Sequence, residues 1–168
     1  MATLKTGNGH GKYFDPSSFH DVIAYILNPH KVPNFYGGYH INMIDPIEDM
    51  AQISTQYGKT NGVHLRHFIL SFSPDEVQDA SIVNKIARMI VPYLGREYQT
   101  VFAVHEDAPH LHIHIVCNAI SYIDGHRYRG GIGDYNRLYY YIRSVLKAFR
   151  IYNFHDVPYV PASGHPDE

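Results

Sequence analysis

The most constraining feature of this sequence is a run of histidines that alternates with aliphatic residues. Every second position is a histidine, and the places beside them are aliphatic: His110, Leu111, His112, Ile113, His114 and Ile115. This period of two is typical of a β-strand, on which successive side chains point to opposite faces. The three imidazoles therefore share one face of the strand, and the aliphatic side chains pack on the other.

A fourth histidine stands at the end of the preceding apolar run, residues 100–104, as His105. A hairpin that pairs this run with residues 110–118 brings His105 beside His112 and His114. A row of imidazoles is costly to bury without partners, and neutral imidazole is a common metal ligand. We therefore interpret the cluster as a three-histidine metal site, which by ligand softness suits zinc, nickel or copper. A surface strand that merely tolerates its histidines is the simpler alternative.

The composition is that of one globular domain. The chain has 168 residues, 45% of them hydrophobic, which is enough for a real core. Its single cysteine excludes an intrachain disulfide framework. No stretch has the length of a transmembrane helix and the N-terminus has no signal-peptide pattern, so we expect a soluble, intracellular protein.

The charge gives little support to nucleic-acid binding, and the aromatic content gives more. A formal net charge of -2 lacks the basic footprint that such proteins usually carry. Fifteen tyrosines and eight phenylalanines nevertheless provide surfaces on which unpaired bases can stack, although most such rings fill the core.

The remaining periodicities predict an α+β fold. We expect helices at about 18–28, 46–57, 73–94 and 134–149, and strands at 39–44 and 63–72 beside the hairpin. The helix at 73–94 begins with the capping-box pattern Ser-Pro-Asp-Glu. The predicted architecture is a central antiparallel sheet with helices packed on one face and the three-histidine site on the other. We assign residues 1–152 to the domain and 153–168 to an irregular tail.

Candidate reactive groups lie close to the histidines in this scheme. Tyr25 falls at the border of the apolar stripe of the first helix, where its ring can leave the core with a free hydroxyl. A tyrosine hydroxyl can form a covalent intermediate. Glu106 and Asp107 are both candidates for orienting a histidine ligand or accepting a proton.

Three segments of the chain resemble the motifs of conjugative relaxases and follow one another in the same order as in that family. Conjugative relaxases belong to the HUH class of single-strand endonucleases. Residues 105–118 read His-x-Asp-x-Pro-His-x-His-x-His-x-x-x-Asn and resemble the third motif, with the HUH pair at His112 and His114. Residues 23–31, Ile-Ala-Tyr-Ile-Leu-Asn-Pro-His-Lys, resemble the first motif of the P-type mobilisation relaxases. Residues 67–72, His-Phe-Ile-Leu-Ser-Phe, resemble the second motif.

The resemblance implies a site- and strand-specific DNA endonuclease that also rejoins the strand. Tyr25 would attack a phosphate of single-stranded DNA at the transfer origin of a plasmid or integrative element, and stay linked to the 5′ phosphate. The resemblance assigns Mg²⁺ or Mn²⁺ to His105, His112 and His114, in contrast to the softness argument. Of the two acidic candidates, we take Asp107 as a catalytic residue. It also implies accessory relaxosome proteins, a coupling protein and a bacterial cytoplasmic location.

Two assignments stay open at this point. His110 is an alternative to His105 as the third ligand, although the spacing of His105 matches the family. Basic side chains and the last residue of the third motif are candidates for DNA binding: Lys31, Arg66, Arg127, Arg129 and Asn118. A solvated charged surface is the plainer interpretation of each basic residue.

Two other functions compete with the relaxase. A rolling-circle replication initiator shares the HUH site but carries its tyrosine on a later helix, here Tyr140 or Tyr141. A non-catalytic DNA-binding module of the same fold would cut no strand with any metal.

Overall fold

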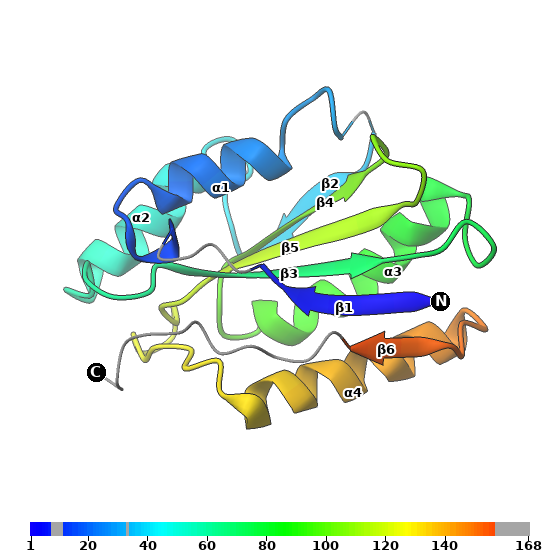
Figure 1. The fold of residues 1–168 in the computed structure, drawn as a ribbon. Helices are drawn as coiled ribbons and strands as arrows, with labels where there is room; N and C mark the ends of the chain where they lie inside the picture. Colours follow the sequence, from blue (N-terminus) through cyan, green and yellow to red (C-terminus); the bar gives the residue numbers. More distant parts are fainter. Residues whose placement is uncertain (8–11, 33, 157–168) are drawn as a thin grey trace.

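The computed structural model describes residues 1–7, 12–32 and 34–156, which form a six-stranded sheet with helices on both faces (Figure 1). Its helices are α1, Ser18–Ile26; α2, Pro46–Gln56; α3, Ala80–Gly95; and α4, Ile132–Ala148, besides a short 3₁₀ helix at Lys12–Phe14. Its strands are β1, Ala2–Thr6; β2, Tyr36–Tyr39; β3, Leu65–Ser71; β4, Thr100–His105; β5, His112–Asn118; and β6, Phe154–Asp156. The strand order is β2-β4-β5-β3-β1-β6, and neighbours are antiparallel except β1 and β6, which are parallel.

Strand β5 lies inside the sheet between β4 and β3, with the alternation that its sequence predicts. Ile113, Ile115 and Cys117 face α3 and α4, so the histidines of β5 face the other way. The register sets His105 of β4 opposite His112 of β5. The predicted hairpin is therefore confirmed.

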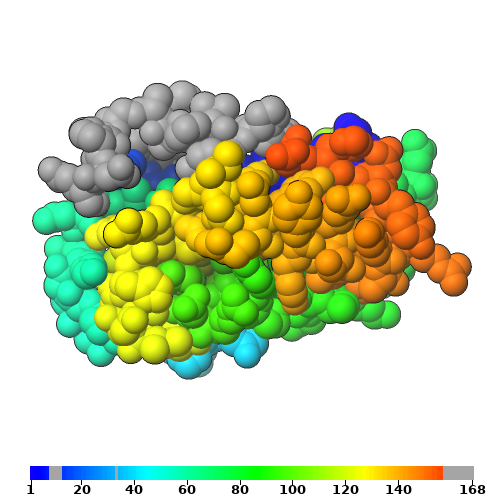
Figure 2. Space-filling model, turned by 90° about the horizontal axis from the view of Figure 1, so that it is seen from below, coloured from blue at the N-terminus to red at the C-terminus, as the bar shows by residue number. Residues whose placement is uncertain are grey.

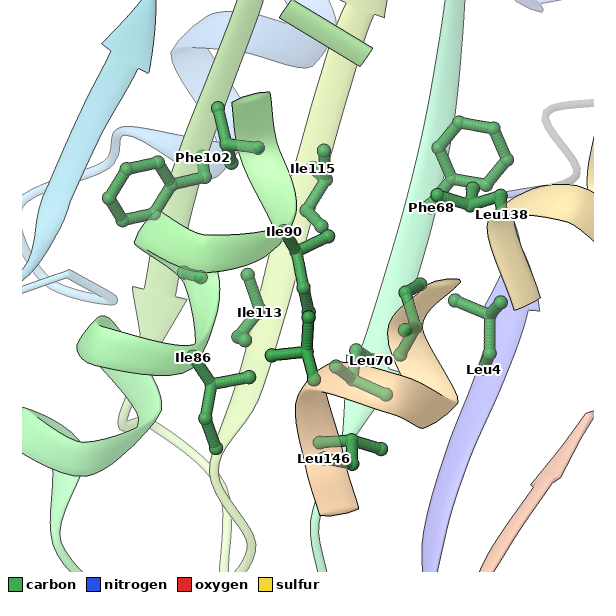
Figure 3. Packing of buried hydrophobic residues seen from close by; sticks show 14 of the residues in the cluster. Leu4, Phe68, Leu70, Ile86, Ile90, Phe102, Ile113, Ile115, Leu138 and Leu146 are labelled. Atoms are coloured by element: carbon green, nitrogen blue, oxygen red, sulfur yellow. The ribbon is translucent and has the colours of Figure 1, made fainter. Parts of the chain in front are cut away.

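The larger core lies between the sheet and the pair of helices α3 and α4 (Figure 3). It includes these aliphatic side chains, each at most 1% exposed: Leu4, Leu70, Ile86, Ile90, Ile113, Ile115, Leu138 and Leu146. Burying one such side chain contributes about 1.5–3 kcal/mol, so this core fixes which face each strand residue takes. Figure 2 shows the outside of this layer, where α4 lies beside the preceding loop and next to part of α3.

A smaller core lies on the histidine face, under α1 and α2. Val22, Ile23 and Ile26 of α1 are buried there in one cluster with Ala103 and Val116 of the sheet. Val116 follows His114 by two positions on the same face, so α1 packs directly beside the histidines.

The predicted α+β class is confirmed, as is the position of the histidines opposite α3 and α4. The prediction did not include α1 and α2 on the histidine face, because an apolar helical stripe does not say which face of a sheet it covers. The sheet also departs from a purely antiparallel one at the β1–β6 pair.

The strand expected at 39–44 lies earlier, at β2, Tyr36–Tyr39. Gly37 and Gly38 have no side chain, which allows β2 to approach its neighbours closely. A Cβ atom at Gly38 would lie 2.4 Å from Ile41 Cγ2, and one at Gly37 would lie 3.0 Å from the Phe102 ring.

Helix α3 begins at Ala80, later than the predicted start at residue 73. The Oγ of Ser73 donates to Glu76 Oε2 at 3.3 Å, but this contact closes only a turn. Asp79 caps the helix instead, because its Oδ1 accepts a hydrogen bond from Ser81 N at 2.8 Å.

The tail predicted to be irregular from residue 153 contains β6, which extends the sheet to Asp156 through its pairing with β1. Residues 157–168 of that tail lie outside the described residues. Within residues 1–7, 12–32 and 34–156, no helix combines the length and apolarity that crossing a membrane requires.

Candidate active site

Three histidines meet on the sheet face that α1 partly covers, and two of them, His105 and His114, are buried. One potential ligand atom from each of His105, His112 and His114 lies within 4.8 Å of the others. The ring centroids of His105 and His114 are 4.1 Å apart, and those of His112 and His114 are 5.0 Å apart. The antiparallel register produces this geometry, since it brings His105 beside two residues that share one face of β5.

Each of these rings has one nitrogen held by a neighbour. His105 Nε2 donates to the carbonyl of Ile26 at 2.9 Å, and His112 Nδ1 donates to the carbonyl of His110 at 3.3 Å. His114 Nδ1 shares a hydrogen bond of 2.7 Å with His67 Nε2. Such outer partners commonly orient histidine ligands of metals.

The opposite nitrogens carry the strongest indication of a bound ion. His105 Nδ1 and His114 Nε2 are buried and have no hydrogen-bond partner in the part of the chain that the structure describes. Leaving a buried polar atom unsatisfied costs about 1–3 kcal/mol, so such atoms are rare without a reason. A divalent cation among the three rings would satisfy them, and the residues present therefore fit a metal.

The protonation of the cluster also suits a metal. Burial lowers the pKa of His105 and His112 below the ordinary value, and it lowers the pKa of His114 to about 2. The neighbouring histidines add to the effect at His114. All three rings are therefore neutral near pH 7, and a neutral imidazole has a lone pair for a ligand bond.

Tyr25 lies against this cluster, on the last turn of α1. Its ring centroid is 5.8 Å from that of His105 and 5.7 Å from that of His114. The side chain is 46% exposed, and its hydroxyl forms no hydrogen bond with any residue that the structure describes. The position at the border of the apolar stripe thus gives a ring fixed beside the histidines with its hydroxyl open to a substrate.

A charged pair stands beside Tyr25. Lys31 Nζ lies 2.6 Å from Asp107 Oδ2 and 5.3 Å from the centre of the Tyr25 ring. Its hydrogen bond lowers the pKa of Asp107 and raises the pKa of Lys31, so both groups are charged near pH 7. Asp107 Oδ1 is 3.9 Å from His105 Nδ1, which is too long for a hydrogen bond.

The structure distinguishes between the two acidic candidates, Glu106 and Asp107, and between the two candidates for the third ligand, His105 and His110. Glu106 accepts a hydrogen bond from Asn34 at 3.3 Å, whereas Asp107 contacts Lys31 within the site. His110 is exposed in the loop before β5 and does not belong to the cluster of potential ligands, which contains His105.

Of the predicted DNA-binding residues, Lys31 is the one that contacts the site. Arg66 donates to the carbonyls of Tyr128 and Arg129, and it lies on the sheet face opposite the histidines, opposite Cys117 in the register. Arg127 donates to the carbonyls of Val63 and Asn61. Both guanidinium groups are therefore used inside the fold, while the side chain of Arg129 is exposed.

Asn118 does not lie at the surface, which corrects its selection as a DNA-binding residue. The side chain is fully buried, and its Nδ2 donates to Met50 O and Gln99 Oε1, each at 3.0 Å. Its Oδ1 accepts from Ile120 N at 3.0 Å. The side-chain amide of Asn118 therefore connects the end of β5 to α2.

Two residues of the site were not predicted, His67 and Tyr13. His67 bridges His114 and the Tyr13 hydroxyl, with 3.0 Å between Tyr13 Oη and His67 Nδ1. The available signal was the alternation in β3, which puts His67 and Ile69 on one face. The pairing of β3 with β5 that gives this signal its meaning is not readable from one sequence.

The competing tyrosines lie elsewhere. Tyr140 and Tyr141 are on α4, which covers the sheet face opposite the histidines (Figure 1). The Tyr141 hydroxyl donates to the carbonyl of Met89 at 2.8 Å. The sheet therefore stands between these hydroxyls and the cluster.

Comparison with known proteins agrees with this geometry. The chain is 35% identical to Protein rlx of Staphylococcus aureus over 78 residues, which cover 46% of this chain and 24% of that protein. It is 37% identical over 71 residues to the group II intron-interrupted relaxase LtrB of Lactococcus lactis subsp. cremoris (strain MG1363), covering 42% of this chain and 13% of LtrB. It is 40% identical over 75 residues to Protein TraI of Escherichia coli, covering 42% of this chain and 10% of TraI.

These matches span less than a quarter of the length of each relative. A family model described as the MobA/VirD2-like relaxase nuclease domain matches residues 25–151, which contain Tyr25 and all three histidines of the cluster. Since this match covers most of the 168 residues, the chain belongs to the MobA/VirD2-like relaxase nuclease-domain family.

Proposed function

We propose that this domain nicks one DNA strand at a transfer origin through a covalent phosphotyrosine and later rejoins it, so that conjugative transfer of a plasmid or integrative element can begin. The observation that carries this proposal is the position of Tyr25, whose ring is within 6 Å of both His105 and His114 and whose hydroxyl is open. A nucleophile beside a group that neutralises phosphate charge is what a phosphoryl transfer needs.

In the proposed step the Tyr25 oxygen attacks the scissile phosphorus. The bond from phosphorus to the 3′ oxygen breaks, the phosphate stays on Tyr25 with the 5′ end, and the 3′ oxygen leaves as a hydroxyl after taking a proton. The phenolic proton passes to water, which reaches the half-exposed side chain. Because the phosphotyrosine is itself a phosphodiester, attack by a 3′ hydroxyl rejoins the strand without a nucleotide cofactor.

The charged groups around Tyr25 have separate roles in this proposal. The Lys31 ammonium stabilises negative charge on the Tyr25 oxygen, and Asp107 holds Lys31 in place through their 2.6 Å contact. His105 Nδ1, His114 Nε2 and the free nitrogen of His112 would hold the divalent ion. When bound, the ion supplies positive charge to a non-bridging phosphate oxygen.

The proposed ion is Mn²⁺ or Mg²⁺, as in relaxases. The same imidazoles can also bind Zn²⁺ or Ni²⁺ in vitro. The proposed substrate is single-stranded DNA of a transfer origin in a bacterial cytoplasm. Accessory relaxosome proteins and a coupling protein are the partners expected from the family. We take residues 1–152 as the catalytic domain, together with β6, which completes its sheet.

A covalent-adduct gel tests the proposal. Wild type, Tyr25→Phe, Tyr140→Phe and Tyr141→Phe are incubated with single-stranded DNA of the transfer origin, with Mn²⁺ and then with EDTA. We expect a shifted protein band that needs Mn²⁺ and is lost only in Tyr25→Phe. Tyr140 is a matched control because it is 61% exposed on the opposite face.

Two other outcomes reject the proposal. A band that survives Tyr25→Phe and is lost in Tyr140→Phe or Tyr141→Phe assigns the protein to the replication initiators. DNA that binds without any adduct, under every metal, leaves a non-catalytic binding module.

A further inference from the structure

A hydrogen-bonded chain runs from Tyr13 through His67 to His114, behind the three-histidine cluster. Tyr13 Oη lies 3.0 Å from His67 Nδ1, and His67 Nε2 lies 2.7 Å from His114 Nδ1. We propose that His67 is a positioning residue, which holds the His114 ring and fixes its tautomer so that Nε2 is left for the metal. This inference rests on the metal centre proposed above.

The direction of this chain decides whether His114 can bind an ion. When His114 Nδ1–H donates to His67 Nε2, His67 Nδ1–H donates to the Tyr13 oxygen, and His114 Nε2 keeps its lone pair. In the opposite direction Tyr13 donates to His67, His67 donates to His114 Nδ1, and neutral His114 carries its proton on Nε2. Ion binding therefore requires the first direction, in which His67 is the acceptor.

The pairing of β3 with β5 positions His67 beside His114. The register of β3 and β5 sets His67 opposite Val116, which lies two residues along β5 from His114 on the same face, and His67 is 8% exposed. Burial raises the pKa of Tyr13 to about 12, so its hydroxyl stays neutral near pH 7, and the oxygen of a neutral hydroxyl can accept a hydrogen bond.

Gly7 provides the space that the Tyr13–His67 pair needs. Its backbone N–H donates to the carbonyl of His67 at 2.8 Å. A Cβ atom on Gly7 would lie 2.5 Å from Tyr13 Oη and 2.7 Å from His67 Nδ1, closer than real Cβ contacts occur. Gly7, the residue after β1, thus leaves the Tyr13–His67 pair undisturbed.

His114 is also the ligand whose orientation depends on another side chain. His105 and His112 donate to backbone carbonyls, which no substitution removes, whereas His114 relies on the imidazole of His67. Without an acceptor at this place, a buried Nδ1–H stays unsatisfied, so the ring loses its preference for the tautomer that leaves Nε2 free for an ion. Loss of an outer partner of this kind typically weakens metal binding about 10–100-fold.

The test measures Mn²⁺ affinity of DNA-free protein by titration calorimetry, and the melting temperature in EDTA. His67→Phe keeps a ring but removes the acceptor, and we expect about 10–100-fold weaker binding. His67→Gln offers an amide oxygen and should recover most of the loss. Tyr13→Phe removes the acceptor for His67 Nδ1–H and should weaken binding about threefold. His64→Phe is the matched control, since His64 is a buried histidine immediately before β3 and outside the cluster.

A second readout does not involve a metal at all. The ¹⁵N shifts of the His114 ring in metal-free protein report which nitrogen carries the proton. We expect mainly the Nδ1–H tautomer in wild type and a change toward Nε2–H in His67→Phe. If that variant fails to fold, the same shifts in Tyr13→Phe decide, with the change expected in the same direction.

Two failures are distinguishable. Equal Mn²⁺ affinity and an unchanged His114 tautomer in the His67 variants overturn the positioning role and leave the metal centre standing. Wild-type protein that binds no Mn²⁺ overturns the metal centre, and this inference with it.

Discussion

Lys31 Nζ lies 2.6 Å from Asp107 Oδ2 and 5.3 Å from the centre of the Tyr25 ring. Lys31 and Tyr25 are both supplied by the first motif, Asp107 by the third, and the loop after α1 brings them together. A backbone hydrogen bond holds the two segments together, because Glu106 N donates to the carbonyl of Lys31 at 3.1 Å. A positive charge is thus held beside the proposed nucleophile by contacts within the chain.

Replacing Lys31 by methionine should slow adduct formation about tenfold, because the charge that stabilises the Tyr25 oxygen is lost. Asp107→Asn should have a smaller effect, since it leaves the ammonium but loosens its position. Single-turnover rates at saturating DNA measure both. Lys85→Met on the exposed side of α3 is the control, and equal rates in Lys31→Met and wild type would reject this role.

Asn118→Ala should destabilise the fold by about 1–3 kcal/mol, because it leaves buried partners at Met50, Gln99 and Ile120 without their hydrogen bonds. Urea unfolding measures this change. DNA affinity, measured where both proteins are folded, should stay within about twofold of wild type. A variant of unchanged stability that loses DNA affinity would return Asn118 to the DNA-binding residues.

The features that could be predicted from this sequence are the local ones. The alternation over residues 110–118 predicted β5 and the face of its histidines, because a period of two has one structural meaning. The helical spacing around Tyr25 predicted its half-exposed position for the same reason. Both features are local, so the chain itself carries enough information to assign them.

What was missed depends on partners far away in the sequence. Arg66 appeared to be a free cation, but two carbonyls more than 60 residues away accept its hydrogen bonds. His67 gains its role through the pairing of β3 with β5, 47 residues apart at His114. One sequence fixes the periodicity of a strand but not its neighbours, so long-range contacts such as these stay hidden.

Metal-free protein should lose stability as the pH falls below the ordinary histidine value of 6.5. Burial lowers the pKa of His114 to about 2, so the folded state holds the neutral ring while the unfolded state takes up a proton. The stabilisation is therefore complete above about pH 6.5 and is lost as the pH falls toward the folded value. His114 alone should cost about 1.4 kcal/mol between pH 7.5 and 5.5.

Urea unfolding in EDTA at several pH values measures this slope. His105 and His112 contribute in the same direction, because burial also lowers the pKa of each ring. His114→Phe should flatten the slope, and His30→Phe, which changes an exposed ring, should not. A slope that is unchanged by His114→Phe would show that this ring titrates normally in the folded protein.

The choice between His105 and His110 as the third ligand gives the last prediction. His105 is fully buried, belongs to the cluster of potential ligands and has an Nδ1 without a partner among the described residues, whereas His110 is exposed in the preceding loop. His105→Ala should therefore weaken Mn²⁺ binding at least 100-fold, and His110→Ala should change it less than about threefold. Calorimetric titration of both variants, checked for folding by melting in EDTA, decides the question. The reverse order of effects would move the third ligand to the loop and would require His112 to turn away from the carbonyl of His110, to which it now donates.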